Sequence, residues 1–365
     1  MSEWQTFCLK DLGKIVGGAT PPTNNPKNYG NKIAWITPKD LSTLQGRYIK
    51  KGSSSISRLG FKSCSCVLLP KHAILFSSRA PIGYVAIAKK RLCTNQGFKS
   101  IIPNKKIYFE FLYYLLKYHK DNISNIGGGT TFKEVSGATL GLFEVKIPPT
   151  YYEQQKIART LSVLDQKIEN NHKINELLHT LAYKIYEYYF KYKPKNAKLE
   201  QIIIENPKSS IMVKNAQKTQ DKYPFFTSGD NILSYPIAII DGRNCFLNTG
   251  GNAGIKFYVG KASYSTDTWC IGANEFSDYL YLLLSSIKNH INQSFFQGTS
   301  LKHLQKNLLK KYPIYMPSAH EIKKFNQIMM PLLTLISINT RTSKKLEQIR
   351  DFLLPLLLKQ QVKPQ

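Results

Sequence analysis

Histidine and carboxylate side chains, which do most hydrolytic and metal-assisted chemistry in proteins, are few in this sequence and poorly grouped. The seven histidines, at positions 72, 119, 172, 179, 290, 303 and 320, form no pairs with Cys, Asp or Glu at metal-ligand spacing. A nuclease pattern can be assembled only from Asp121, Glu144 and Lys146, and Glu144 has no match elsewhere in the chain. The sequence therefore predicts neither a metal site nor a hydrolytic centre.

Cofactor-binding motifs are also missing. Residues 250–256 are rich in glycine, but Lys256 is displaced by one position from the phosphate-binding pattern and no Ser or Thr follows it. Such a glycine-rich loop is better suited to close approach to a DNA backbone. The Gly-rich turn and the Asn/Asp-Pro-Pro-aromatic loop of an amino-methyltransferase do not occur. We therefore expect no catalytic residue and no bound cofactor.

The balance of charge indicates a polyanionic partner. Lys and Arg total 51 against 23 Asp and Glu, which gives a formal net charge of +28. An AT-rich genome explains part of the lysine count but not the shortage of acids. Nucleic acid is favoured over a membrane surface, because there is no signal peptide and the longest apolar run, residues 329–338, is too short to cross a bilayer. The six scattered cysteines are typical of reduced thiols in a cytoplasmic protein.

The elements that position any binding residues occur twice. Gly83 matches Gly254, and Phe98 matches Trp269, each 171 positions later. Four further matches follow in the same order: residues 109–116 with 277–284, 129–133 with 298–302, 147–148 with 316–317, and Glu153 with Glu321. The offset drifts only from 171 to 168. Six ordered matches at nearly constant spacing indicate two copies of one unit.

Each copy has the same predicted layout. Residues 34–37, 73–76 and 84–87 read as short strands separated by Gly, Asn and Pro turns. A helix is predicted around residues 109–118, and prolines at 148–149 and 317 close the mixed segment. A glycine-free helical stretch then runs over roughly residues 151–193.

The helical stretch carries apolar residues at alternating spacings of four and three, which is typical of a coiled-coil seam. The first seam comprises Ile157, Leu161, Leu164, Ile168, Asn171, Asn175 and Leu178, and continues through Ala182, Ile185 and Tyr189. The second comprises Phe325, Met329, Leu332, Ile336, Asn339, Ser343 and Leu346, and continues through Arg350, Leu353 and Leu357. Polar residues recur at the same layer, which favours a helix pair of fixed register. Pro331 and Pro355 predict a kink or an early end, and Arg350 fits the seam badly.

The expected fold is therefore α+β. Two repeated mixed domains are separated by a pair of long antiparallel coiled-coil helices in a pseudo-two-fold arrangement. The expected boundaries are residues 1–150 for the first domain, 151–193 for the first helix, 194–318 for the second domain and 319–365 for the second helix.

This organisation resembles the specificity (S) subunit of type I restriction–modification systems over essentially the whole chain. Residues 12–22 and 34–41 are similar to the family's G-x-T-P and W-I…D-L opening, and residues 95–98 are similar to its N-Q-G-F strand. Residues 147–168 resemble its I-P-x-P-x-x-E-Q…L-D-x-x-I start of the spacer helix. The second copy departs from that last motif, because residues 321–325 lack the Gln and no Asp matches Asp165.

The resemblance implies a non-catalytic subunit whose two target-recognition domains each read half of a split site in double-stranded DNA. It implies helices that set the gap between the half-sites and dock methyltransferase (M) subunits, two in number. The M subunits carry S-adenosylmethionine and methylate adenine, and restriction (R) subunits add ATP-driven cleavage. The resemblance implies that none of these cofactors binds this chain.

Base reading requires side chains such as Arg, Lys, Asn and Gln at groove edges, and phosphate contacts use Lys, Ser, Thr and Gly amides. The candidates in the first domain are Lys39, Ser78, Arg79, Asn95, Gln96, Thr130 and Lys133. The candidates in the second are Thr249, Asn252, Lys256, Thr266, Thr299 and Lys302. Trp35, Phe98 and Trp269 are assigned to the core. Because the two sets differ, we expect an asymmetric bipartite site.

Two other classes of protein stay open on the residues alone. A complete nuclease or a fused methyltransferase would act by itself with Mg²⁺ or S-adenosylmethionine. An RNA-binding or scaffold protein with a basic surface would bind single-stranded RNA as well as duplex DNA, without a bipartite footprint.

Overall fold

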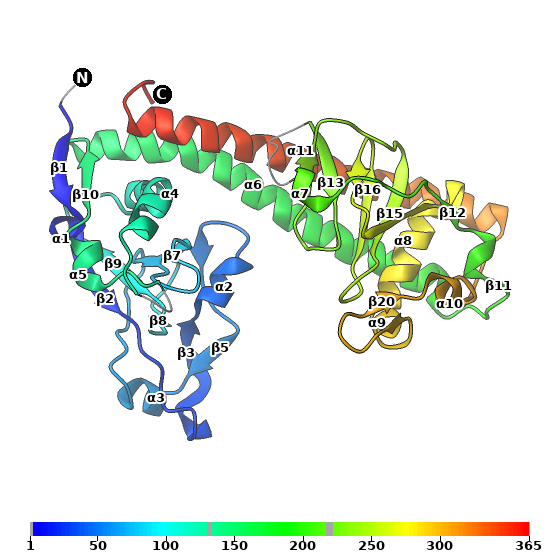
Figure 1. Ribbon diagram of the computed structural model, residues 1–365, viewed down its shortest axis with the longest axis horizontal. Helices are drawn as coiled ribbons and strands as arrows, with labels where there is room; N and C mark the ends of the chain where they lie inside the picture. The colour runs from blue at the N-terminus through cyan, green and yellow to red at the C-terminus, as the bar shows by residue number, and fades with distance from the viewer. Residues whose placement is uncertain (1–2, 130–132, 217–221, 365) are drawn as a thin grey trace. The chain divides into compact units, whose positions relative to one another are not determined.

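A computed structural model describes residues 3–129, 133–216 and 222–364, and the chain divides into two compact units (Figure 1). Unit 1 comprises residues 1–170 and 344–365, and unit 2 comprises residues 171–343. The division falls within two long helices, α6 (Tyr151–Tyr186) and α11 (Ala319–Leu358). A π-helix, Glu187–Lys191, extends α6. Each unit therefore contains one mixed domain and a segment of both long helices.

Both long helices begin with the same local motif. The Thr150 hydroxyl accepts a hydrogen bond from the Glu153 amide (3.2 Å), and the Ser318 hydroxyl accepts one from the Glu321 amide (3.3 Å). The Thr150 hydroxyl donates to the Glu153 carboxylate (3.1 Å), and the Ser318 amide donates to the Glu321 carboxylate (3.0 Å), so each capping residue and its glutamate bond reciprocally. The helices α6 and α11 begin at Tyr151 and Ala319, directly after these capping residues.

The prediction that prolines shorten the second helix is wrong. The helix α11 runs through Pro331 and Pro355 without interruption. An interior proline costs roughly 3 kcal/mol because it removes a backbone hydrogen bond. The buried side chains Met329, Leu333 and Leu354 lie on the same helix, and their packing offsets that cost.

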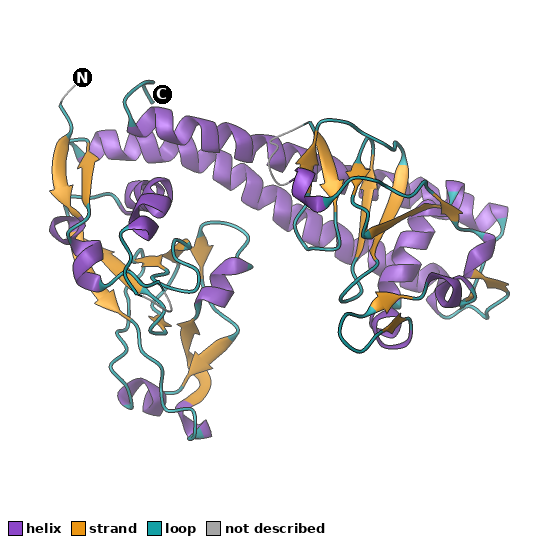
Figure 2. Cartoon of the chain, viewed as in Figure 1, coloured by secondary structure: helices purple, strands orange, loops and turns teal. Residues whose placement is uncertain are grey.

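The domain of unit 1 is built on a five-stranded sheet, β2-β9-β6-β7-β4, and a three-stranded sheet, β5-β3-β8 (Figure 2). The first contains β2 (Gly13–Gly17), β9 (Lys99–Pro103), β6 (Ile74–Phe76), β7 (Val85–Ala88) and β4 (Tyr48–Ile49). The second contains β5 (Ser54–Ile56), β3 (Tyr29–Ile36) and β8 (Cys93–Thr94). A separate pair joins β1 (Gln5–Cys8) to β10 (Glu144–Ile147). The helices are α1 (Leu9–Leu12), α2 (Pro38–Ser42), α3 (Arg58–Lys62), α4 (Phe109–Asn125) and α5 (Gly137–Gly141), with a 3₁₀ turn at Pro26–Asn28.

The domain of unit 2 has a four-stranded sheet, β12-β18-β15-β16, and a three-stranded sheet, β14-β13-β17. The first contains β12 (Ile204–Glu205), β18 (Thr268–Gly272), β15 (Arg243–Asn248) and β16 (Ile255–Val259). The second contains β14 (Leu233–Tyr235), β13 (Tyr223–Phe226) and β17 (Ser263–Tyr264). Two further pairs join β11 (Ala197–Lys198) to β21 (Pro313–Ile314) and β19 (Phe296–Gln297) to β20 (His303–Leu304). The helices are α7 (Val213–Ala216), α8 (Ser277–Ser286), α9 (Lys288–Ser294) and α10 (Lys306–Lys310), with 3₁₀ turns at Leu199–Gln201 and Asn274–Phe276.

The two domains share one strand topology. In both, the central strand of the larger sheet pairs antiparallel with its two neighbours: β6 with β7 and β9, and β15 with β16 and β18. In both, the smaller sheet contains one parallel pair, β3 with β8 and β13 with β17. This repeat and the two long helices confirm the α+β fold class. Within the described residues, β4 has no counterpart in the larger sheet of unit 2.

Each unit has its own apolar core, and both long helices contribute to it. In unit 1, the buried residues Ile157 and Leu161 of α6 and Leu354 and Leu357 of α11 cluster with helix α4. In unit 2, the buried residues Ala182 and Tyr186 of α6 and Phe325, Met329 and Ile336 of α11 cluster with α8 and the larger sheet. Trp35, Phe98 and Trp269 are all buried, as the sequence predicts.

Polar side chains pair between the helices at the layer that the sequence singles out. In unit 2, Asn171 donates to the Ser343 hydroxyl (3.1 Å) and Asn339 donates to the Asn175 side-chain carbonyl (2.9 Å). The helices run antiparallel there, because rising numbers on α6 meet falling numbers on α11. The remaining seam candidates are also sheltered: Ile168 is buried, and Leu164, Leu178, Leu332 and Leu346 are partly buried.

Candidate nucleic-acid interface

In the first domain, the segments that carry the candidate residues meet at one edge of the two sheets. The Asn95 amide donates to the Ile36 carbonyl (2.9 Å), which holds the loop after β8 against the end of β3. The Ser78 amide donates to the Gly97 carbonyl (2.8 Å), and the Val135 amide donates to the Ser78 carbonyl (3.0 Å). Backbone hydrogen bonds therefore gather four separate stretches of the chain at this edge.

The side chains at this edge differ in how freely they reach solvent. Lys39, Gln96 and Lys133 are exposed. Arg79 is half-buried and lies 3.6 Å from the Glu134 carboxylate. Asn95 is also half-buried, and its side-chain oxygen accepts a hydrogen bond from the Gly97 amide (3.0 Å), so it shapes the turn. Exposed amide and ammonium groups thus surround a turn that is held in a fixed conformation.

Two of the candidates in this domain require separate comment. Ser78 is fully buried, and its hydroxyl has no hydrogen-bond partner among the described residues. Its backbone joins the two loops, so its side chain is out of reach of a phosphate in this conformation. Thr130 lies outside the described residues.

The turn at residues 95–97 rests on a glycine that no side chain can replace. An ideal Cβ on Gly18 would lie 2.0 Å from the Asn95 carbonyl oxygen and 2.4 Å from that of Thr94. The neighbouring Ala19 amide donates to the Thr94 carbonyl (3.0 Å), which holds the two backbones close together. The sequence motif at residues 12–22 therefore packs directly against the turn at residues 95–97, which carries two of the candidate reading residues.

The second domain gathers its candidates in a similar way. The Thr249 amide donates to the Asp267 carbonyl (3.1 Å), and the Gly251 amide donates to the Lys302 carbonyl (2.9 Å). Three loops, which follow β15, β17 and β19, therefore lie together. Asn252, Thr266, Thr299 and Lys302 are exposed there, whereas the Thr249 hydroxyl is engaged with the Asp267 carbonyl (2.8 Å).

Lys256 has a structural environment that the sequence did not predict. Its ammonium group donates to the Thr227 carbonyl (2.7 Å) and to the Asn248 side-chain oxygen (3.3 Å). Burial also lowers the pKa of Lys256. The side chain ties the smaller sheet to the larger one, so a contact with DNA would require these bonds to break.

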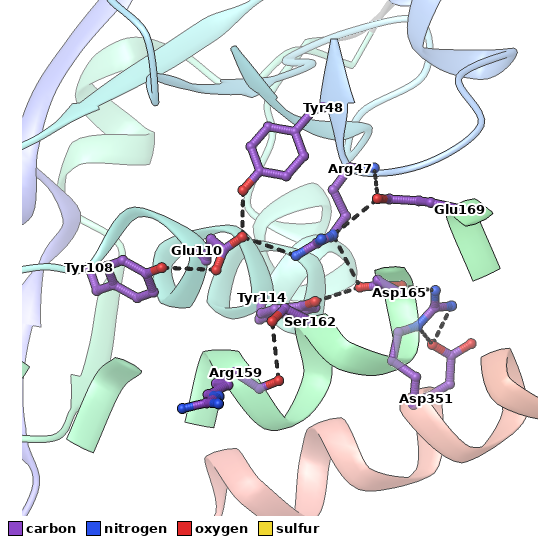
Figure 3. Close-up of polar contacts among 11 residues, drawn as sticks. Arg47, Tyr48, Tyr108, Glu110, Tyr114, Arg159, Ser162, Asp165, Glu169 and Asp351 are labelled. Atoms are coloured by element: carbon purple, nitrogen blue, oxygen red, sulfur yellow. Dashed lines mark hydrogen bonds and ion pairs between the residues drawn. The ribbon is translucent and has the colours of Figure 1, made fainter. Parts of the chain in front are cut away.

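Sequence reasoning missed a group of buried charges that fixes the first domain on its long helix (Figure 3). Arg47 lies 3.1 Å from Glu110 of α4 and 3.1 Å from Glu169 of α6, and its side chain is 3% exposed. Asp165 of α6 lies 3.9 Å from Arg47 and accepts a hydrogen bond from the Tyr114 hydroxyl (2.5 Å). Burial by itself lowers the pKa of Arg47, but the neighbouring Glu169 and Glu110 charges raise it above its ordinary value.

The expectation that Arg350 fits its helix position badly is wrong. In unit 1, its guanidinium donates to the other Asp165 oxygen at 2.7 Å. Asp165 therefore bridges α4, through Tyr114, and α11, through Arg350. The available sequence signal was Arg350 at an apolar seam position together with Asp165 directly beside the seam residue Leu164.

Unit 2 has an equivalent anchor built from different residues. Arg243 of β15 makes two hydrogen bonds of 2.6 Å to the Asp278 carboxylate at the start of α8. It also donates to the Thr334 hydroxyl of α11 (2.9 Å). Burial raises the pKa of Asp278, and the bonds and charge of Arg243 oppose that shift. One arginine thus joins a domain helix to a long helix in each unit.

The described residues contain no group of three or more His, Cys, Asp or Glu side chains placed to hold a metal ion. No helix in that part of the chain is long and apolar enough to cross a membrane. What the geometry does provide is two sets of exposed polar and basic side chains, each on loops braced by a folded domain. Such a surface is suited to nucleic acid, because basic side chains contact phosphates and polar side chains contact base edges.

These features define a two-domain protein that reads nucleic acid. The family model of the type I restriction modification DNA specificity domain matches residues 1–180 and again residues 193–348, so the chain belongs to this family. The chain is 33% identical to the type I restriction enzyme MjaIX specificity subunit of Methanocaldococcus jannaschii, over 98% of this chain and 93% of that one. It is 31% identical to the HindI specificity subunit of Haemophilus influenzae, over 46% of this chain and 37% of that one.

A solved structure shares the fold. The crystal structure of the type I restriction-modification S subunit from M. genitalium superimposes with a TM-score of 0.63, covering 97% of this chain and 96% of that one at 18% identity. The resemblance found in the sequence motifs is therefore confirmed, and this chain is a type I specificity subunit that recognises DNA sequence.

Proposed function

We propose that this chain reads an asymmetric bipartite site in double-stranded DNA, without catalysing a reaction itself. The observation that carries this proposal is the repeated domain with different side chains at matched loop positions. Arg79 of the first domain corresponds to Gly250 of the second, and Gln96 corresponds to Asp267. Arg is suited to guanine and Gln to adenine, and the second domain has neither at these positions. Two domains of one topology would thus read different half-sites.

The reading residues we propose are those that the structure leaves exposed or half-exposed at the two loop clusters. They are Lys39, Arg79, Gln96 and Lys133 in residues 1–150, and Asn252, Thr266, Thr299 and Lys302 in residues 194–318. Asn95 and Thr249 support the loops that carry them, through the bonds described above.

We further propose that the spacer helices, residues 151–193 and 319–365, dock two methyltransferase subunits, and that restriction subunits join the complete enzyme. In unit 2, Ile174, Leu177 and Leu181 of α6 are 42%, 70% and 49% exposed and follow helical spacing. On α11, Ile328, Leu335 and Ile338 are each more than 40% exposed. Apolar faces of this kind on a helix pair are typical of a surface that a protein partner covers.

Methylation-site mapping tests the proposed function. Cells that carry this chain with its neighbouring methyltransferase subunit would be compared with cells in which this gene is deleted. We expect a split, asymmetric methyladenine motif that disappears on deletion. Exchange of residues 1–150 for those of another specificity subunit should change one half of the motif and leave the other half unaltered.

An unchanged methylome, with the methyltransferase subunit expressed and active, would refute the proposal. Binding of single-stranded RNA by the purified chain would then be measured next. Equal affinity for RNA and for duplex DNA would support the alternative of a general basic scaffold.

A further inference from the structure

The first domain carries a cluster of cations at the end of its larger sheet where β6 begins and β4 and β7 end, opposite Arg79 along β6. Three turns meet there: the chain before β6, the β7–β8 turn, and the chain after β4. The Leu69 and Leu92 backbones form a bridge, and the Lys89 amide donates to the Ile49 carbonyl (2.9 Å). These contacts bring together six cationic side chains, which we term the basic patch: Lys50, Lys51, Lys71, Lys89, Lys90 and Arg91.

All six side chains of the basic patch are exposed, and none makes an ion pair or side-chain hydrogen bond with a described residue. The three turns contain no acidic residue. The closest acid along the chain is Asp40, whose carboxylate is occupied by the Ser53 amide (2.7 Å) and the Thr37 amide (2.8 Å). The six cations outnumber the Asp40 carboxylate, and the repulsion among them is relieved when an anionic surface binds.

The basic patch is not a property of the repeated fold. The turn equivalent to residues 89–91 in the second domain is residues 260–262, which contains Lys261 as its single cation. Asp241 lies close by, because the Gly260 amide donates to the Gly242 carbonyl (2.8 Å). Lys50 and Lys51 follow β4, the strand that the larger sheet of unit 2 lacks among its described residues. The first domain therefore has a strand and a cluster of charge that the described residues of the second domain lack.

We propose that the basic patch binds phosphates of the DNA duplex beside the half-site that the first domain reads. This inference rests on the proposed function and adds to it a sequence-independent contact that only one domain makes. The patch lacks Asn, Gln and exposed aromatic side chains, so it is suited to phosphate groups and unsuited to base edges.

The strand β6 sets the distance between the patch and the reading loops. Lys71 precedes β6 and Arg79 follows it, eight residues later. At about 3.3 Å per residue, the two ends lie at most roughly 26 Å apart. With a rise of about 3.4 Å per base pair, the phosphates that the patch binds lie within about eight base pairs of the bases that the loops read.

The salt dependence of DNA binding tests this assignment. In one variant of the full-length chain, Lys51, Lys89, Lys90 and Arg91 are replaced by Gln. The matched control replaces four exposed, unpaired lysines of the same domain, Lys10, Lys14, Lys105 and Lys146, by Gln, and removes the same charge. Affinity for a duplex that contains the motif, and for a shuffled duplex, is measured between about 50 and 200 mM salt.

We expect the slope of log K against log salt to become shallower by about 0.9 for each phosphate that the variant no longer neutralises, or by roughly 3 to 4 for the patch variant. Affinity should fall equally for the two duplexes, with the methylation motif unchanged and the control close to the unmodified chain. The single variant Lys90→Glu, at the tip of the β7–β8 turn, should lower the slope by about 1 or more and serves if the fourfold variant does not fold.

An unchanged slope, or a change equal to that of the control, would overturn the assignment. Loss of methyltransferase-subunit binding in the same variant would then assign the basic patch to a protein partner. These outcomes are distinct from failure of the proposed function, because that failure would appear as the absence of any split methylation motif in cells with the unmodified chain.

Discussion

The arginine that joins the first domain to its long helix offers a strong test of what holds unit 1 together. Replacement of Arg47 by Met keeps much of the side-chain volume and removes the charge. Glu110, Asp165 and Glu169 would then lose their shared partner, at side-chain exposures of 11%, 5% and 17%. Removal of one partner from a buried ion pair costs about 3–5 kcal/mol, because the remaining charge is left uncompensated. We expect unit 1 to lose free energy of unfolding of this order.

The measurement must distinguish unit 1 from unit 2. The chain has three tryptophans, of which Trp4 and Trp35 lie in unit 1 and Trp269 lies in unit 2. In a Trp269→Phe background, tryptophan fluorescence therefore reports unit 1. With a urea dependence of about 2 kcal/mol per molar, the Arg47→Met midpoint should fall by roughly 1.5 to 2.5 M.

Two controls make the result specific. Lys99→Met removes a more exposed ion pair of unit 1, with Glu134, and should change the midpoint far less, because Glu134 keeps Arg79 as a partner. The double variant Arg47→Met, Glu110→Gln should recover part of the stability, because one uncompensated charge is removed. A midpoint for Arg47→Met that matches the Lys99 control would refute the reasoning, since the buried network would then contribute no more stability than an exposed pair.

Two further predictions concern the candidate turn and the effect of pH. Gly18→Ala should disrupt the turn at residues 95–97 and reduce DNA affinity at least tenfold, since its Cβ would collide with backbone; Gly17→Ala, whose Cβ meets nothing within 4 Å, is the control. A fully retained affinity for Gly18→Ala would contradict this. The Lys310 ammonium and the Trp269 indole N–H lower the pKa of Glu205 below its ordinary value of 4.5. The ionised Glu205 carboxylate should therefore stabilise unit 2 above about pH 4.5, and this stabilisation should be lost as the pH falls through the lowered pKa of Glu205. Glu205→Gln should flatten this acid dependence of unfolding, and an unaltered dependence would exclude the contribution.

The sequence predicted most of the architecture because the signals involved are periodic. A spacing of four and three indicated the two long helices, and the prolines at 148–149 and 317 marked the end of each mixed segment before them. An ordered set of matches, such as Phe98 with Trp269, revealed the repeat. Such patterns depend on neighbours along the chain and on one buried face, which a single sequence displays directly.

What the sequence did not reveal depends on tertiary contacts. The prolines of α11 were expected to kink it or end it early, but it continues through both, because core packing on the same helix outweighs their local cost. Ser78 was a reasonable phosphate ligand by residue type, and only its burial removes it. Arg47 was one of 51 cations, and nothing local distinguishes a buried arginine from an exposed one. Such roles are set by partners more than 60 residues away.

The division of unit 1 between the two ends of the chain has a consequence for its synthesis. Leu354, Leu357 and Leu358 complete its apolar core, and they follow all of residues 171–343. At translation rates of about 5 to 20 residues per second, the ribosome needs roughly 10 to 35 s to make that intervening segment. During this interval the first domain is already outside the ribosome with part of its core uncovered, whereas unit 2 is contiguous and can fold as it emerges. A chain that stops before the last turns of α11 would therefore lack part of the core of unit 1, although the first domain is synthesised before unit 2.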